Sequence, residues 1–341
     1  MNHIRRHFLI GGSALFAASC TKLGGVVRSS MRPAARIETF DNRMLDIIDP
    51  AQSLDVLSSG YGWSEGPVWD KARGQLYFTD VPGNTAYVWS SGTGTEVFLE
   101  PSGASVGHGE GFREPGANGL LMGQDGRLLI CNHGKRVVEA MDITTGDRVT
   151  LVESYDGKAF NSPNDLIQAS NGDIFFTDPP YGLEGLNESP LKEMPVNGVY
   201  KLAPDGNVVR LLDDMTFPNG IALSQDEAWL YVSQSDPDAP LIRRISLKGT
   251  FTDEAWFDAA PYIADGPGLP DGLAVTTNGL VFATGPGGVF VLTQEGEALG
   301  RINLGRASAN CTFGEDGQSL FIAAHDRLMR VRTKVKGLGW D

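Results

Sequence analysis

Residues 163–178 read PNDLIQASNGDIFFTD, and this unit decides the fold because the chain repeats it. The unit opens on small polar residues, runs through a short apolar alternation, turns at a Gly-containing step and enters a second apolar strand. Five further copies read SEGPVWDKARGQLYFTD (64–80), ANGLLMGQDGRLLICN (117–132), PNGIALSQDEAWLYVSQ (218–234), PDGLAVTTNGLVFATG (270–285) and ANCTFGEDGQSLFIAA (309–324). A unit repeated at such a period is typical of solenoids, propellers and related arrays.

The spacing of the copies suits the blades of a propeller. Their leading polar residues follow one another at steps of 53, 46, 55, 52 and 39 residues, and are Glu65, Asn118, Asn164, Asn219, Asp271 and Asn310. Further strand patterns lie between the copies, for example at 86–90, 95–99, 198–202 and 208–212, so four strands per unit are expected. The sequence therefore predicts an all-β fold, a six-bladed β-propeller that spans residues 37–341.

A ring of blades has to close, because an open ring leaves an unpaired sheet edge. The segment 35–57 precedes the first copy, and the last copy lacks an outer strand. We expect this early segment to supply that strand.

The amino-acid composition limits which binding partners are expected. The chain has 341 residues, 41% of them apolar and 21% charged, which is enough apolar material for a sizeable core. Its formal net charge of -14 would repel phosphate backbones, so nucleic acid is excluded as an expected partner. No Cys/His cluster has zinc-site spacing, and Cys131 and Cys311 are expected to be buried free thiols.

The N-terminus has the features of an export signal. Residues 1–20 combine Arg5-Arg6 with a short apolar run, which resembles a twin-arginine signal for export of a folded protein to the periplasm. Residues 17–20, AASC, also resemble a lipoprotein cleavage box, although Leu is commoner than Ala three positions before the cysteine. Lipidation of Cys20, the only expected link to a membrane, stays open, and residues 21–36 are expected to form a tether.

The repeat predicts a metal site on the axis. Each leading polar residue begins an innermost strand, and these strand starts meet at one end of a propeller channel. Glu65, Asn164, Asn219 and Asp271 offer hard oxygen donors, which suit Ca²⁺ at about 2.3–2.6 Å with water or substrate completing its shell. Mg²⁺, Mn²⁺ and Zn²⁺ remain alternatives.

A simpler explanation is that Asn118-Gly119, Asn219-Gly220 and Asp271-Gly272 are ordinary hairpin turns, which such dipeptides favour. Gly-containing turns already occur eight residues after Asn118 and Asp271, at Gly126 and Gly279. We therefore favour the metal site.

Four motifs also resemble those of the gluconolactonase and regucalcin family, and they occur in that family's order between about residues 62 and 324. They are EGPVW (65–69), SPND (162–165), FPNG (217–220) and PDG (270–272). The resemblance implies a six-bladed propeller in which, as in diisopropyl fluorophosphatase, a Glu, two Asn and an Asp hold a catalytic calcium. Those roles would fall on Glu65, Asn164, Asn219 and Asp271.

The resemblance further implies hydrolysis of a sugar lactone, an aldonolactone such as gluconolactone. Asp271 is the candidate catalytic base or nucleophile, because a carboxylate at the metal can also reach the attacking group. Substrate contacts are expected where second strands return to the channel mouth, and the candidates are Asn118, His133, Asp178 and Tyr181, with weaker cases for Asn310 and His325.

Two other functions stay open: a phosphotriesterase-like hydrolase on the same metal site, and a non-enzymatic propeller that binds calcium or carbohydrate. A Ser-His-Asp hydrolase is less favoured, because the chain has no Gly-x-Ser-x-Gly elbow.

Overall fold

The structure is a computed structural model, which describes residues 35–105 and 110–340. The predicted export signal and all but the last two residues of the predicted tether lie outside these ranges. In the described part of the chain, no helix is both long enough and apolar enough to cross a membrane.

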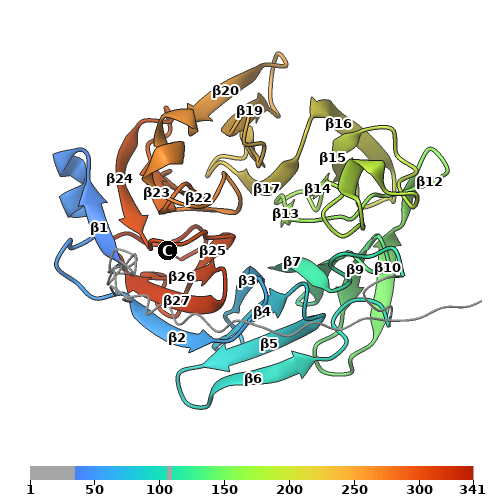
Figure 1. Cartoon of the computed structure of the whole chain (residues 1–341), viewed down its shortest axis with the longest axis horizontal. Helices are drawn as coiled ribbons and strands as arrows, with labels where there is room; N and C mark the ends of the chain where they lie inside the picture. The colour runs from blue at the N-terminus through green and yellow to red at the C-terminus, as the bar shows by residue number, and fades with distance from the viewer. Residues whose placement is uncertain (1–34, 106–109, 341) are drawn as a thin grey trace, which may run out of the picture. The chain divides into compact units, whose positions relative to one another are not determined.

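Six antiparallel sheets are arranged around a central axis, which confirms the predicted six-bladed propeller (Figure 1). Blades 1 to 4 each consist of four strands that follow one another along the chain. Blade 1 contains β3 (Ser64–Asp70), β4 (Gln75–Asp80), β5 (Thr85–Ser90) and β6 (Gly94–Leu99); blade 2 contains β7 (Ala117–Met122), β8 (Leu128–Asn132), β9 (Val137–Met141) and β10 (Arg148–Val152). Blade 3 contains β13 (Leu166–Gln168), β14 (Ile174–Asp178), β15 (Asn197–Leu202) and β16 (Val208–Met215); blade 4 contains β17 (Pro218–Leu223), β18 (Trp229–Gln234), β19 (Leu241–Ser246) and β20 (Asp253–Asp258).

The last two blades take strands from both ends of the described chain. Blade 5 contains β21 (Leu273–Val275), β22 (Val281–Gly285), β23 (Gly288–Leu292) and β24 (Ala298–Asn303), and blade 6 contains β25 (Asn310–Gly314), β26 (Ser319–Ala324) and β27 (Arg327–Arg332). β2 (Asp55–Ser59) pairs antiparallel with β27 and completes blade 6, which confirms the predicted closure. β1 (Arg36–Thr39) adds a fifth strand to blade 5, so the propeller begins at Arg36.

The remaining elements are short and lie outside the blades. A two-stranded hairpin pairs β11 (Ser154–Tyr155) with β12 (Lys158–Ala159), and the 3-10 helices among the described residues are η1 (Asn42–Asp46), η2 (Leu186–Glu188) and η3 (Ala260–Asp265).

The apolar core lies between the faces of neighbouring blades. One cluster joins Val68 and Tyr77 of blade 1 to Leu120 and Ile130 of blade 2, and the other interfaces are built in the same way. Inner strands such as β8 and β9 therefore bury side chains on both faces, whereas outer strands such as β6 and β20 are partly exposed. Cys131 and Cys311 are buried and free, as expected.

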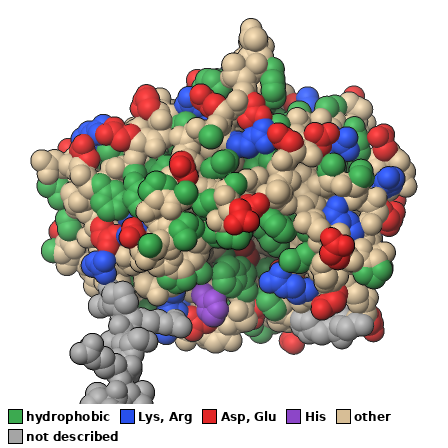
Figure 2. Space-filling view, turned by 45° about the horizontal axis from the view of Figure 1, so that its top comes forward, with side chains coloured by type: hydrophobic (Ala, Val, Ile, Leu, Met, Phe, Trp, Pro, Cys, Tyr) green, Lys and Arg blue, Asp and Glu red, His purple; other side chains and the backbone are tan. Residues whose placement is uncertain are grey.

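The outer surface mixes charges of both signs. Figure 2 shows acidic and basic side chains interspersed on the face it presents, without a continuous basic patch there. This distribution agrees with the net charge of -14.

Candidate active site

The six leading polar residues lie within the first two residues of innermost strands or, for Asn164 and Asp271, two residues before them, and all six are buried. Three of these starts are irregular, because the pairing register shifts just at the polar residue: between Glu65 and Val68, between Ala117 and Leu120, and between Pro218 and Ile221. Such β-bulges turn a side chain away from the regular pleat.

Glycines after the polar residues let the strand starts approach closely. Gly66 has φ +50°, and a Cβ on it would lie 2.1 Å from the Asn118 carbonyl oxygen. A Cβ on Gly220 would lie 2.1 Å from the Asp271 carbonyl oxygen. Only glycine fits where two backbones come this close.

In three blades, a threonine on the second strand donates a hydrogen bond to the backbone of the next blade. Thr79 Oγ1 donates to the Asn118 carbonyl at 3.2 Å, Thr177 Oγ1 to the Asn219 carbonyl at 2.7 Å, and Thr284 Oγ1 to the Ala309 carbonyl at 3.2 Å. At these three strand starts, the backbone at or next to the polar residue is therefore fixed by the neighbouring blade.

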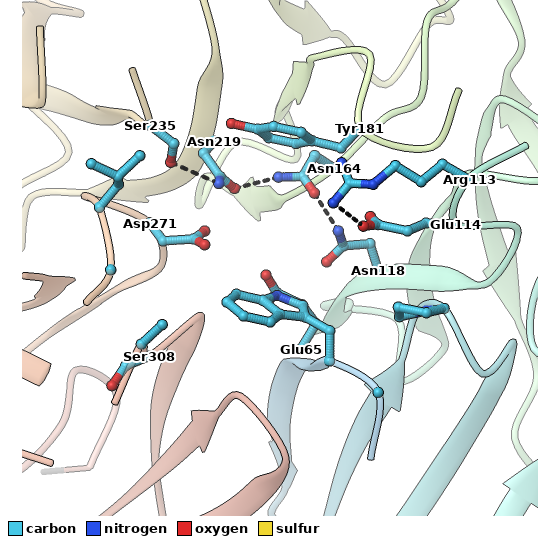
Figure 3. A pocket seen from close by; sticks show the side chains of 16 residues that line it. Glu65, Arg113, Glu114, Asn118, Asn164, Tyr181, Asn219, Ser235, Asp271 and Ser308 are labelled. Carbon is cyan, nitrogen blue, oxygen red and sulfur yellow. Dashed lines mark hydrogen bonds and ion pairs between the residues drawn. The ribbon is translucent and has the colours of Figure 1, made fainter. Parts of the chain in front are cut away.

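These strand starts line a cavity of about 540 Å³ at one end of the channel. The cavity contains all four predicted metal ligands, Glu65, Asn164, Asn219 and Asp271, together with Asn118 (Figure 3). The rest of its wall consists of Gly62, Trp63, Pro82, Arg113, Glu114, Tyr181, Ser235, Gly268, Leu269, Ala307 and Ser308. Asn310 is not part of it, since its amide points at Asp165 Oδ2, 3.3 Å away.

A row of hydrogen bonds orients the amides along one wall. Asn118 Nδ2 donates to Asn164 Oδ1, Asn164 Nδ2 donates to Asn219 Oδ1, and Asn219 Nδ2 donates to Ser235 Oγ at 2.9 Å. Ser235 Oγ donates in turn to the Pro270 carbonyl. The row fixes which atom of each amide is the oxygen, and each amide oxygen keeps a second lone pair for a ligand.

The two carboxylates of the set, Glu65 and Asp271, line the same cavity as the amides. Burial, followed by the charge of Asp165, raises the pKa of Glu65 to about 8, against a stabilising hydrogen bond from the Gly66 amide. Burial, followed by the charges of Glu65 and Asp165, raises the pKa of Asp271 well above its usual range. No lysine or arginine is among the groups that contribute most to the pKa of Glu65 or Asp271.

This donor set fits a hard divalent cation. Two carboxylates balance a charge of +2, two fixed amides add neutral oxygens, and the open cavity leaves room for water or substrate. A bound cation would favour the ionised form of both carboxylates, and so would oppose the burial and the mutual repulsion that raise their pKa values. No group of three or more His, Cys, Asp or Glu side chains is placed to hold a metal within residues 35–105 and 110–340, so a site here depends on the amides.

Two of the four predicted substrate contacts line the cavity, namely Asn118 and Tyr181. His133 does not: it is fully buried, and its Nε2 lies 3.4 Å from Asn118 Nδ2. Burial lowers the pKa of His133 to about 4, so the ring is neutral and lies behind Asn118 rather than against a ligand. His325 is outside the wall as well, half-exposed and edge-on to Trp63 at 5.3 Å.

Asp178 also lies outside the cavity, and its contacts give a structural reason. Its carboxylate accepts hydrogen bonds from the backbone amides of Asn161 and Ser162, at 2.8 and 2.9 Å. Asp80 does the same in blade 1, where it accepts from the amides of Gly62 and Trp63. Both carboxylates hold the segment that leads into the innermost strand of their own blade, so Asp178 positions the backbone before Asn164 and is not part of the cavity wall.

Sequence reasoning missed the ion pair between Arg113 and Glu114, 3.0 Å apart, at the cavity wall. These residues belong to the connection between β6 and β7, and the Gly182 carbonyl accepts hydrogen bonds from both of their amides. Burial raises the pKa of Glu114 to about 7, although Arg113 opposes the shift. The only signal in the sequence is the length of this connection, because the segment is not part of the repeat.

Comparisons with known proteins show the family of the chain. The family model of the SMP-30/gluconolactonase/LRE-like region matches residues 63–326, which include every residue of the cavity wall except Gly62. The chain belongs to this family. A gluconolactonase of Zymomonas mobilis subsp. mobilis is 43% identical over 310 residues, covering 89% of this chain and 87% of the relative.

Solved structures support the same family assignment. A gluconolactonase from Xanthomonas campestris is 30% identical with a TM-score of 0.75, and the match covers 89% of this chain and 99% of that one. A calcium-binding regucalcin from Agrobacterium tumefaciens has a TM-score of 0.64 at 18% identity, with 83% of this chain and 94% of that one covered, and this likeness concerns the fold alone.

Proposed function

We propose that this member of the SMP-30/gluconolactonase family is a divalent-cation-dependent lactonase that converts an aldonolactone and water into the aldonic acid. The main support is the convergence of Glu65, Asn164, Asn219 and Asp271 on one cavity, in a chain 43% identical to a gluconolactonase. Calcium is the proposed ion, because the donors are all hard oxygens.

The cation would be held by the two carboxylates and the two fixed amide oxygens. When bound, it would polarise the lactone carbonyl and stabilise the negative charge that develops on the carbonyl oxygen. Asp271 would accept a proton from the attacking water, since its carboxylate faces the cavity from the wall opposite Asn118 (Figure 3).

The remaining wall suits a polyhydroxylated ring. Glu114, Arg113 and Asn118 gather on one side of the cavity and offer carboxylate, guanidinium and amide groups to sugar hydroxyls (Figure 3). Trp63 provides an apolar surface beside Glu65, against which a ring face can pack. These residues favour a sugar lactone over an apolar one.

A panel of lactones, assayed after chelation and re-addition of Ca²⁺, Mg²⁺, Mn²⁺ or Zn²⁺, tests the proposal. We expect cation-dependent hydrolysis of aldonolactones, with slower turnover of unsubstituted lactones. A phosphotriester in the same panel tests the phosphotriesterase alternative. Saturable sugar binding without hydrolysis of any lactone would instead favour the non-enzymatic alternative and refute the proposal.

We further propose that the protein acts in the periplasm after folded export, on the grounds of residues 1–20 alone. Replacing Arg5 and Arg6 by Lys should retain the protein inside the cell, as seen by fractionation. Replacing Cys20 by Ala should release it from membranes if Cys20 is lipidated.

A further inference from the structure

Two hydroxyl groups in the cavity wall are buried and lack a hydrogen bond of ordinary geometry to a described residue, those of Tyr181 and Ser308, although the Tyr181 hydroxyl lies near that of Ser235. Buried polar groups in proteins nearly always have a partner, and an exception in a binding cavity points to a ligand that completes it. Tyr181 is the better placed of the two, because its ring is held rigidly.

The Tyr181 ring is fixed by its neighbours and not by its hydroxyl. It stacks on Phe217, with ring centroids 5.7 Å apart and an angle of 14° between the planes. It belongs to the connection between β14 and β15, where a bridge between Phe112 and Leu183 joins this connection to the one that carries Arg113. The hydroxyl is thus presented to the cavity on an ordered scaffold.

Figure 3 shows the Tyr181 hydroxyl directed toward the side of the cavity that carries Ser235 and Asp271. The Ser235 hydroxyl is already engaged, since it accepts from Asn219 and donates to the Pro270 carbonyl. Burial, followed by the charge of Asp271, raises the pKa of Tyr181 above its ordinary value. The phenol therefore keeps its proton and is a hydrogen-bond donor at the edge of the reaction site.

We propose that the Tyr181 hydroxyl is a catalytic hydrogen-bond donor to the ring oxygen of the lactone, the atom that leaves carbon when the ring opens. This inference rests on the proposed lactonase function. Water attacks the carbonyl carbon and gives a proton to Asp271, and the bond between that carbon and the ring oxygen then breaks. The bonding pair stays on the ring oxygen, which takes up the proton that Asp271 received, so water has been added and nothing else is consumed.

A hydrogen-bond donor to the leaving oxygen speeds ring opening more when more negative charge develops on that oxygen in the transition state. The ring oxygen of an aldonolactone leaves as a strongly basic alkoxide, which gains much from a hydrogen bond in the transition state. The ring oxygen of dihydrocoumarin leaves as a phenoxide, which stabilises its own charge. Loss of the donor should therefore slow the first reaction far more than the second.

The test is Tyr181→Phe, which removes the hydroxyl and keeps the stacked ring. Tyr200→Phe is the matched control, because its hydroxyl also lacks a hydrogen bond of ordinary geometry, lies near Arg210 and belongs to the apolar core between blades 2 and 3, away from the cavity. Both variants should unfold within about 2 °C of wild type, as seen by calorimetry.

For Tyr181→Phe we expect kcat for glucono-δ-lactone to fall about 10–100-fold, after subtraction of the uncatalysed rate, with KM within about twofold. The rate with dihydrocoumarin should fall less than about threefold. Tyr200→Phe should leave both rates unchanged. Unchanged kcat in Tyr181→Phe, a change confined to KM, or equal loss with both lactones would overturn the inference while leaving the lactonase function intact. Inactivity of the wild type toward every lactone would refute the proposed function itself.

Discussion

Glu65 and Asp271 illustrate at the scale of single residues how a fold can prepare a site for a ligand. Each carboxylate is buried, each lies near other acidic groups, and burial together with those charges raises both pKa values. Isolated buried carboxylates of this kind cost stability unless a cation or a proton balances them. We propose that binding of a cation would compensate this cost.

The variant Asp271→Asn tests this role directly. It removes the proposed base and one charged ligand, so kcat/KM for an aldonolactone should fall at least about 1,000-fold. The metal-free variant should be no less thermostable than metal-free wild type at pH 8, because the repulsion with Glu65 is gone. Steady-state rates and calorimetry measure both effects.

Asp316→Asn is the control for this comparison. Asp316 is an exposed partner of Arg332 on blade 6, and the change should leave activity within about twofold of wild type. More than a tenth of wild-type activity in Asp271→Asn would exclude Asp271 from the mechanism.

At the scale of elements, the site depends on six strand starts that touch one another. Register shifts turn the polar side chains inward, threonines of neighbouring blades hold their backbones, and glycines permit the close approach. The cavity is therefore a property of the ring and not of any one blade.

The variant Gly220→Ala tests whether the site needs the close approach of neighbouring strand starts. Its new Cβ would lie 2.1 Å from the Asp271 carbonyl oxygen, so the starts of blades 4 and 5 would have to separate. Calcium affinity and kcat/KM should both fall about tenfold or more, as measured by calorimetric titration and initial rates. Gly92→Ala is the matched control, because a Cβ there meets nothing within 4 Å, and it should behave as wild type. Equal behaviour of the two variants would contradict the account.

The repeat predicted the blades, the closure by β2 and five polar side chains of the cavity, because each of these follows from one periodic unit. The five side chains are those of Glu65, Asn118, Asn164, Asn219 and Asp271. It did not predict β1, which pairs with blade 5 from outside the repeat. Arg113 and Glu114 were missed for a similar reason, since backbone contacts with Gly182 place them. His133 and Asp178 were predicted to contact substrate, and the structure places both outside the cavity wall, because His133 is buried behind Asn118 and Asp178 holds the backbone of Asn161 and Ser162.

At the scale of the whole molecule, the fold buries acidic groups that take up protons in the folded state. Burial is the largest cause in each case, and it raises the pKa of Glu65 to about 8, of Glu114 and Asp178 to about 7, and of Asp165 to about 6. A carboxyl whose pKa is higher in the folded than in the unfolded state contributes stability at low pH that is lost as pH rises through the folded value.

The melting temperature of the metal-free protein should therefore fall steadily between about pH 5 and pH 8.5. Excess Ca²⁺ should reduce this fall, because the ion binds the ionised form of Glu65 and Asp271 and so stabilises the folded state more at high pH. Calorimetry across this range, with chelator and with Ca²⁺, measures the difference. A metal-free protein that becomes more stable toward pH 8.5 would contradict the assigned pKa shifts.

The most direct test of the central claim is a titration of metal-free protein with Ca²⁺ in which bound ion and aldonolactone hydrolysis are measured in the same samples. The account predicts one ion per chain in the channel and activity that rises in proportion to occupancy, with both lost in Asp271→Asn. Full lactone hydrolysis by protein shown by elemental analysis to contain no divalent metal would contradict it.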